Sequence, residues 1–129
     1  MKTNATTPTR QERLNIANDF IHFISTHGRN FFAHNGECGF LELDGRERVW
    51  FTDSYSKKRI YTHYDGKWRG FTNGGTLKSL IFSIKDYVLF DHKLNSSYFT
   101  SRKDWPHPWG YGDDINEVRN HGIKTGIIS

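Results

Sequence analysis

The sequence predicts an α+β fold, with an antiparallel meander of about five strands packed against an N-terminal helix and a second helix after the sheet. Two stretches carry apolar residues at helical spacing, one near the start of the chain and one after residue 76. The part between them carries three Asx-Gly pairs, which favour tight hairpin turns. A chain of 129 residues has the size of a single domain with one modest core.

The first element is a helix that follows a polar tail, residues 1–8. Thr9 precedes Glu12 by three positions, which is the spacing of a capping box. The helix is expected to end at His27-Gly28, because glycine readily adopts the left-handed conformation that follows a helix. Its apolar stripe consists of Leu14, Ile16, Ala17, Phe20, Ile21, Phe23 and Ile24. We therefore place the domain at residues 9–129 and treat residues 1–8 as a flexible tail.

Short strands are expected next, separated by the pairs Asn35-Gly36, Asp44-Gly45 and Asp65-Gly66. Each pair favours a two-residue type I′ turn, because both central residues of that turn need positive φ. The expected strands cover about residues 30–34, 37–43, 46–52, 58–64 and 67–72.

A two-residue turn at Asp44-Gly45 also predicts which side chains share a face of the sheet. The buried face would hold Cys38, Phe40, Val49 and Phe51, and the opposite face Leu41, Leu43, Arg46, Arg48 and Trp50. In a continuous sheet, that opposite face would extend to Arg59, Tyr61, His63 and Trp68. A slip of one residue in the connection at 53–57 would instead bury Tyr61 and Trp68 and expose Lys67 and Arg69.

The sheet is followed by Asn73-Gly74-Gly75-Thr76, which is expected to start the second helix. Its apolar face comprises Leu77, Leu80, Ile81, Ile84, Tyr87 and Val88. Residues 91–112 are rich in Ser, Pro, Gly and aromatic residues and are predicted to form a long ordered loop. Asp113 or Asp114 can cap a short final helix that reaches His121-Gly122.

The composition bears on compartment and chemistry. The single cysteine, Cys38, cannot form an intrachain disulfide, and the polar start of the chain is unlike a signal peptide. No run approaches the roughly 18 apolar residues that a membrane span needs. We expect a cytoplasmic protein that does not engage a membrane.

Catalytic and metal-binding motifs are missing from the sequence. The seven histidines show no HExxH, CxxC or His-x-His spacing, so scattered surface histidines are the simplest interpretation. Asp113, Asp114 and Glu117 form an acidic cluster, but its position at a helix start is explained by capping. We predict no metal and no cofactor. An enzyme with an unrecognised site is a weaker hypothesis than a protein that binds nucleic acid or another protein.

The segment from Arg46 to Arg69 concentrates the charge of the chain. It holds seven Lys/Arg against three acids, an excess of +4 that equals the formal net charge of the whole protein. Aromatic rings alternate with these cations, and such a mixture suits a partner with phosphates and stackable bases, whether DNA or RNA. The competing interpretation is a sheet with half-buried rings and solvated lysines. The candidate nucleic-acid-binding residues are Arg46, Arg48, Trp50, Lys57, Lys58, Arg59, Tyr61, His63, Lys67, Trp68 and Arg69.

A second aromatic segment, residues 105–111, holds three large rings and two prolines in seven positions. The rings can pack as a lid over the sheet or project as anchors for a protein partner. In the latter case the protein-binding residues are Trp105, Trp109 and Tyr111.

The run from Arg59 to Leu77, RIYTHYDGKWRGFTNGGTL, resembles a segment of small proteins found in bacterial phages, plasmids and integrative elements. The resemblance extends to His27-Gly28-Arg29 and Val49-Trp50-Phe51, and so to about residues 10–90. It implies no activity and no catalytic residues. It implies a context only, that of a mobile-element accessory protein acting on DNA or on a host defence system.

Charge, rings and resemblance together predict a non-enzymatic accessory protein that binds nucleic acid through a basic, aromatic sheet surface. The alternative is a protein-binding inhibitor or adaptor of the anti-defence type, which docks on a host complex that handles nucleic acid.

Overall fold

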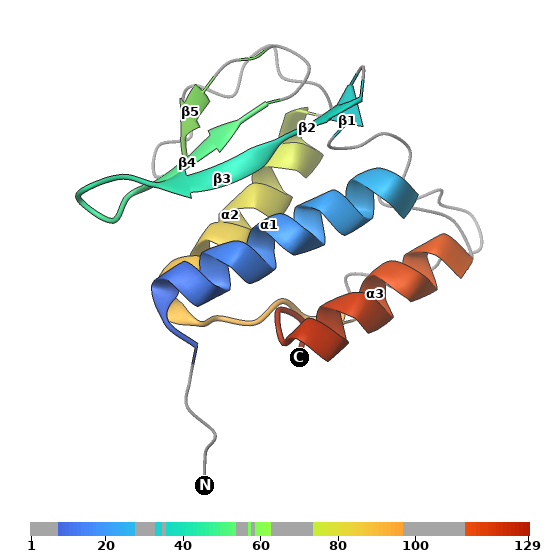
Figure 1. Cartoon of the computed structure of the whole chain (residues 1–129). Helices are drawn as coiled ribbons and strands as arrows, with labels where there is room; N and C mark the ends of the chain where they lie inside the picture. The colour runs from blue at the N-terminus through green and yellow to red at the C-terminus, as the bar shows by residue number, and fades with distance from the viewer. Residues whose placement is uncertain are drawn as a thin grey trace, which may run out of the picture.

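The computed structural model describes residues 8–27, 33–34, 36–53, 57, 59–62, 74–96 and 113–129, with only the backbone for 33–34, 74–78 and 113–114. The elements are α1 (Arg10–His27), β1 (Ala33–His34), β2 (Glu37–Cys38), β3 (Phe40–Leu43), β4 (Val49–Thr52), β5 (Arg59–Tyr61), α2 (Gly74–Phe90) and α3 (Asp113–Thr125). Helix α1 packs against β3, α2 and α3, and the sheet lies along the opposite side of α1 from α3 (Figure 1). Among the described helices, none has the length and apolarity needed to cross a bilayer.

The α+β class is confirmed, but a continuous five-stranded meander is not. The described strands form two antiparallel sheets, β1-β2 and β3-β4-β5. In the first sheet His34 lies opposite Glu37, and Gly36 has the positive φ of 80° that the expected turn needs, while Asn35 lies outside the described residues. The expected strand at 67–72 and the aromatic loop at 105–111 lie outside the described residues.

Helix α1 begins with the capping box that the sequence predicts. The backbone N–H of Glu12 donates to Oγ1 of Thr9 at 3.1 Å, and the N–H of Thr9 donates to Oε1 of Glu12 at 2.8 Å. This exchange satisfies donors that have no partner within the helix. The predicted stripe is buried at Leu14, Ala17, Phe20, Ile21 and Ile24, with Ile16 and Phe23 partly buried beside it.

The first turns of α1 also bind the end of α2. Arg13 is buried, and its Nε donates to the carbonyl of Val88 at 2.9 Å. The Nε of Arg10 donates to the neighbouring carbonyl of Leu89 at 3.3 Å. The last carbonyls of a helix lack intrahelical donors and carry partial negative charge, so two guanidinium groups stabilise this end of α2.

Asn18 covers the free edge of β3. Its side-chain amide accepts the N–H of Leu41 at 2.7 Å and donates to the carbonyl of Leu41 at 2.9 Å. One side chain thereby occupies the hydrogen-bonding positions that a further strand would take. Helix α1 is fixed to the sheet by this pair of bonds as well as by apolar packing.

The turn between β3 and β4 differs from the prediction. Leu43 lies opposite Val49, and the N–H of Asp44 donates to the carbonyl of Arg48, so three residues form the loop. Glu47, the last of them, has a left-handed φ of 58°, as in a type I turn followed by a bulge. The predicted two-residue turn at Asp44-Gly45 is therefore wrong.

The longer loop changes which β3 side chains are buried. An odd shift in register exchanges the faces of one strand relative to its partner. Leu41 is 1% exposed and Leu43 is packed against the core, whereas Phe40 is 42% exposed. The prediction was wrong for these three residues and correct for Val49 and Phe51, which are buried.

Helix α3 continues past the point where the sequence placed its end. Gly122 does not terminate the helix; it lies within it, close to Phe20 and Ile128. The terminating glycine is Gly126, with φ of 97°. The chain then runs beside Leu94, where Ile127 and Ser129 form backbone hydrogen bonds of 2.9 Å with that residue.

Two histidines join α1 and α3. Phe23 is stacked between the rings of His27 and His121, with centroids 4.0 Å away on either side. His121 bonds Asp19 of α1 at 2.6 Å, and His27 bonds Glu117 of α3 at 3.2 Å. These two histidines are therefore part of the packing between helices rather than scattered on the surface.

Candidate functional site

The candidate site is the face of β3-β4-β5 that points away from the helices. Residues opposite one another in the sheet form two rows across it: Phe40, Thr52 and Arg59, and then Glu42, Trp50 and Tyr61. On the reverse face, Leu41, Val49, Phe51 and Ile60 are buried in the core. The alternation of strand side chains, together with this register, places the cations and rings on the outer face.

Two adjacent rings with a cation at each end form a ladder across this face. The guanidinium of Arg59 lies over the indole of Trp50, 4.2 Å from the ring centroid. The guanidinium of Arg48 lies 5.6 Å from the centroid of Tyr61, and the two rings are 5.1 Å apart. A cation over an aromatic face is attracted by the ring quadrupole, so each contact holds its arginine in place. We call Arg48, Tyr61, Trp50 and Arg59 the cation–ring ladder.

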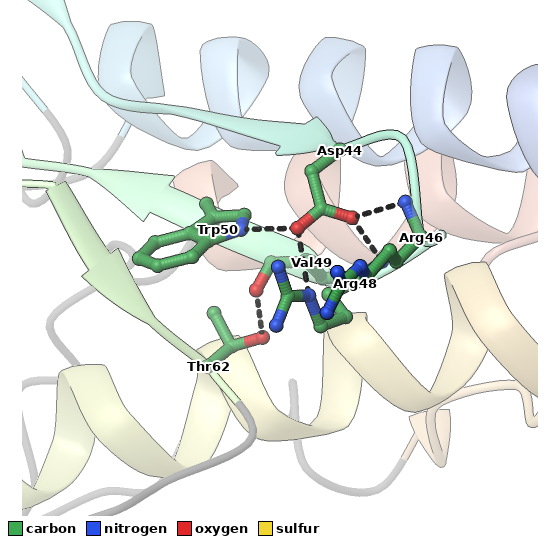
Figure 2. Close-up of polar contacts among 6 residues, drawn as sticks. All are labelled: Asp44, Arg46, Arg48, Val49, Trp50 and Thr62. Carbon is green, nitrogen blue, oxygen red and sulfur yellow. Dashed lines mark hydrogen bonds and ion pairs between the residues drawn. The ribbon is translucent and has the colours of Figure 1, made fainter.

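Asp44 fixes one end of the ladder, as Figure 2 shows. Its Oδ2 accepts the indole N–H of Trp50 at 3.0 Å and the Nε–H of Arg48 at 2.8 Å. Its Oδ1 accepts the backbone N–H groups of Arg46 and Arg48 at 2.8 and 2.9 Å. These donors, the Trp50 indole first, hold the pKa of the Asp44 carboxyl far below its ordinary value. The carboxylate thus orients the loop, a ring and a guanidinium together.

Thr62 holds the far end of β5 against β4. Its backbone N–H and its hydroxyl both donate to the carbonyl of Val49, at 3.1 and 2.6 Å. Thr62 is fully buried, so these bonds also satisfy a polar side chain that has no access to water. The result is a fixed position for Tyr61, the neighbouring residue, beside Trp50.

Carboxylates neutralise much of the positive charge on and around this face. Glu42 lies 3.6 Å from Arg59, and Asp44 lies 2.8 Å from Arg48. Lys57 pairs with Glu37. Arg46 differs, because its guanidinium has no ion pair within the described part of the chain. Of the segment's cations that the structure describes, Arg48, Lys57 and Arg59 are therefore each paired with a carboxylate.

The structure brings together four of the predicted site residues, those of the cation–ring ladder. Their common face excludes the one-residue slip that would have buried Tyr61. Arg46 lies in the adjoining loop, and Lys57 lies apart from the ladder, at Glu37. The other predicted residues, namely Lys58, His63, Lys67, Trp68, Arg69, Trp105, Trp109 and Tyr111, lie outside the described residues. A binding role for any of them stays a prediction.

Sequence reasoning missed three residues that shape this face: Asp44, Glu42 and Phe40. Asp44 was taken only as a turn residue, although its position before Gly45 also suits an acceptor of loop N–H groups. The positions of Glu42 and Phe40 on the outer face depend on the register between β3 and β4. The predicted turn was too short, so the predicted register was wrong. Within the described residues, no group of three or more His, Cys, Asp and Glu side chains is arranged to hold a metal ion.

Comparison with known proteins gives a family. No curated protein and no solved structure matches the chain significantly. A family model does match, and it covers residues 8–129, which include α1, all five strands, α2 and α3. By this match, the chain belongs to the YoqU family.

Proposed function

We propose that the protein is a non-enzymatic accessory protein of a bacterial mobile element that binds nucleic acid through the outer face of β3-β4-β5. The observation that carries this proposal is the cation–ring ladder, with Trp50 and Tyr61 side by side at 5.1 Å. Adjacent half-exposed rings on a sheet offer stacking positions to successive bases. The resemblance to proteins of phages, plasmids and integrative elements supplies the biological context.

The ladder favours stacking over charge as the main source of affinity. Bases stack on aromatic rings and also on the planes of guanidinium groups, which here already lie over the rings. Since bases are free to stack only when unpaired, a single strand suits this face better than a duplex. Ion pairing occupies most of the described cations of this face, so they should add little to the salt dependence of binding.

Among the described residues of this face, Arg46 and Arg59 are the cations best placed to contact phosphate. Arg46 has no ion pair among the described residues. Arg59 can exchange Glu42 for a phosphate, because both side chains are 47% exposed and their N–O distance is 3.6 Å. An exposed pair of this kind contributes less than about 1 kcal/mol. These two described cations should therefore supply one or two phosphate contacts, and each contact should add roughly 0.7 to the slope of log K against log salt for a single strand.

Fluorescence anisotropy with labelled single- and double-stranded DNA and RNA, at two salt concentrations, tests the proposal. Trp50→Ala should weaken binding by about 1–3 kcal/mol, the usual effect of removing one stacking ring. Arg46→Gln should weaken binding less than Trp50→Ala does. It should also reduce the slope of log K against log salt by the contribution of about one phosphate contact. Phe90→Ala is the matched control, since Phe90 is an exposed ring outside the sheet.

The result that contradicts the proposal is the absence of binding at low salt by the unaltered protein. Equal losses for Trp50→Ala and Phe90→Ala would also contradict it, because they would place the contact away from the ladder. A steep salt slope that Trp50→Ala leaves unchanged would refute the stacking mechanism.

A protein partner is the second candidate, and the exposed ring of Phe40 favours it. Phe40 lies on the same face as the ladder and is 42% exposed. Trp, Tyr and Arg side chains are common anchors of protein interfaces, and nearly balanced charge lowers the cost of desolvation. This candidate predicts a stoichiometric complex with a host protein after nuclease treatment of the lysate. Phe40→Ala should abolish the complex, and Phe90→Ala should leave it intact.

A further inference from the structure

A cleft of about 450 Å³, with polar residues at most of its lining positions, lies between α2 and the chain that follows it, away from the residues of the ladder. Its lining residues are Ser79, Ser83, Asp86, His92, Lys93, Leu94 and Asn95. The lining residues that follow α2 belong to the segment that leaves the end of this helix and runs toward the end of α3 (Figure 1). The volume falls within the range of sites for small molecules, about 300–1,000 Å³.

One wall of the cleft is a polar face of α2. Ser79, Ser83 and Asp86 are spaced by four and three residues, so they project from the same side of the helix. Leu80, Ile81 and Ile84, which lie between them in the sequence, are fully buried in the core. The hydrophobic packing of α2 therefore fixes the direction of these three polar side chains.

The other wall is fixed by the C-terminal end of the chain. Asp91 adopts a left-handed φ of 58°, which ends α2 and reverses the chain along it. Leu94 is 5% exposed, and its N–H donates to the carbonyl of Ile127 at 2.9 Å. Its carbonyl accepts the N–H of Ser129, also at 2.9 Å. His92, Lys93 and Asn95 are consequently carried on a segment that is tied to the rest of the fold.

The polar groups in the cleft are largely uncommitted. Within the described residues, the hydroxyls of Ser79 and Ser83, the ring nitrogens of His92 and the ammonium of Lys93 take part in no side-chain hydrogen bond or ion pair. Asp86 lies 3.5 Å from Lys85, a contact between neighbours along the helix. The cleft thus combines several donors, one ammonium and one carboxylate with the apolar side chain of Leu94.

We propose that this cleft binds the phosphate monoester of a sugar, a site independent of nucleic-acid binding by the sheet. Lys93, His92 and the serine hydroxyls supply the charge and the donors that a phosphate group requires. Asp86 is an acceptor for sugar hydroxyls, as acidic residues are for ribose in nucleotide sites. A bare phosphate would leave most of the volume empty and would face the Asp86 carboxylate, so the ligand needs a hydroxyl-bearing part.

Amide chemical-shift titrations with ribose 5-phosphate, adenosine 5′-monophosphate, inorganic phosphate and ribose test this site. Ribose 5-phosphate should bind saturably with a Kd of about 1 mM or tighter and shift amides within residues 79–95. Inorganic phosphate and ribose should each bind at least about tenfold more weakly. Tighter binding of the nucleotide would identify a nucleoside monophosphate as the source of the sugar phosphate, and equal binding would identify a simple sugar phosphate.

Variants then locate the contacts. Lys93→Gln and Asp86→Asn should each weaken the binding of ribose 5-phosphate by about tenfold. Lys93→Gln should also weaken the binding of inorganic phosphate. Lys124→Gln, at an exposed lysine of α3, is the charge-matched control and should change neither titration. Ser83→Ala, which removes only a hydroxyl, gives a further test if either charge variant proves unfolded by circular dichroism. The proposal is overturned if neither ester shifts the cleft amides at about 10 mM, or if the cleft variants bind as the unaltered protein does.

Discussion

Replacing Gly122 by alanine should destabilise the protein, although the same change inside an ordinary helix stabilises it. Gly122 lies within α3, where alanine normally improves the free energy of unfolding by about 1 kcal/mol. Here a Cβ would stand 2.7 Å from Cγ1 of Ile128, closer still to Cδ1, and 3.1 Å from a ring carbon of Phe20. Favourable carbon contacts lie at about 3.5–4.0 Å, so the added methyl group overlaps atoms that are already packed.

The magnitude depends on how far Ile128 can move. Its side chain is 2% exposed, and its N–H donates to the carbonyl of Gly122 at 3.1 Å, so the backbone beside the clash is fixed. Overpacking by one methylene costs about 1–3 kcal/mol, and this close approach favours the upper end. After the gain in helix propensity is subtracted, we expect a net loss of about 2 kcal/mol. For a domain of this size, that corresponds to a fall in Tm of about 5–8 °C.

Urea unfolding followed by circular dichroism measures this effect, with Asn120→Ala as the control on an exposed position of the same helix. Asn120→Ala should change the free energy of unfolding by no more than about 0.5 kcal/mol. In an Ile128→Ala background, Gly122→Ala should become neutral or stabilising, with a coupling energy of about 2 kcal/mol between the two sites. A Gly122→Ala protein as stable as the unaltered one would refute the close approach of the tail to α3.

Three further predictions concern the sheet. Asn18→Ala should cost about 1–3 kcal/mol in urea unfolding, since it leaves the N–H and carbonyl of Leu41 without partners at the edge of β3; an unchanged midpoint would contradict this. Because the pKa of Asp44 is lower in the folded state than in the unfolded chain, its stabilisation is present above about pH 4 and lost as the pH falls further. The free energy of unfolding of the unaltered protein should therefore fall more steeply between pH 5 and pH 2 than that of Asp44→Asn. Parallel pH profiles of the two proteins would contradict this role of Asp44. Burial raises the pKa of the Cys38 thiol, so iodoacetamide should react more slowly at pH 8 with the native protein than with the urea-unfolded chain, and equal rates would contradict the burial.

Local signals in the sequence were sufficient to predict where α1 begins and which of its faces is buried. The capping box of α1 involves residues three apart, and the apolar stripe needs only the helical period, so both could be predicted without the rest of the fold. The end of α3 could not be predicted in this way. Gly122 resembles a terminator in the sequence, but its lack of a side chain serves contacts with Phe20 and Ile128, which only the tertiary structure brings near.

The hairpin between β3 and β4 shows where local turn rules fail. Asp44-Gly45 favours a two-residue turn by composition alone. In the structure, the carboxylate of Asp44 accepts the N–H groups of Arg46 and Arg48, and Glu47 adopts positive φ, which together stabilise a longer loop. Turn propensities depend only on residue types, so they cannot predict the hydrogen bonds that the Asp44 carboxylate accepts from the loop or from the indole of Trp50. The prediction for β4 survived this error because Val49, Trp50 and Phe51 alternate in the same way whichever loop precedes them.

The same hairpin changes how the charge of this protein should be interpreted. A count of residues gives the Arg46–Arg69 segment an excess of four positive charges, which by itself predicts binding driven by counterion release. The structure pairs Arg48 with Asp44 and Arg59 with Glu42, and it uses both arginines to cover aromatic rings. Glu42 lies outside the counted segment, so no count within that segment could include it. If the face binds nucleic acid as proposed, Arg48 and Arg59 should therefore act mainly by orienting the rings. The dependence of affinity on salt, compared with the effect of Trp50→Ala on affinity, separates that role from direct attraction of phosphate.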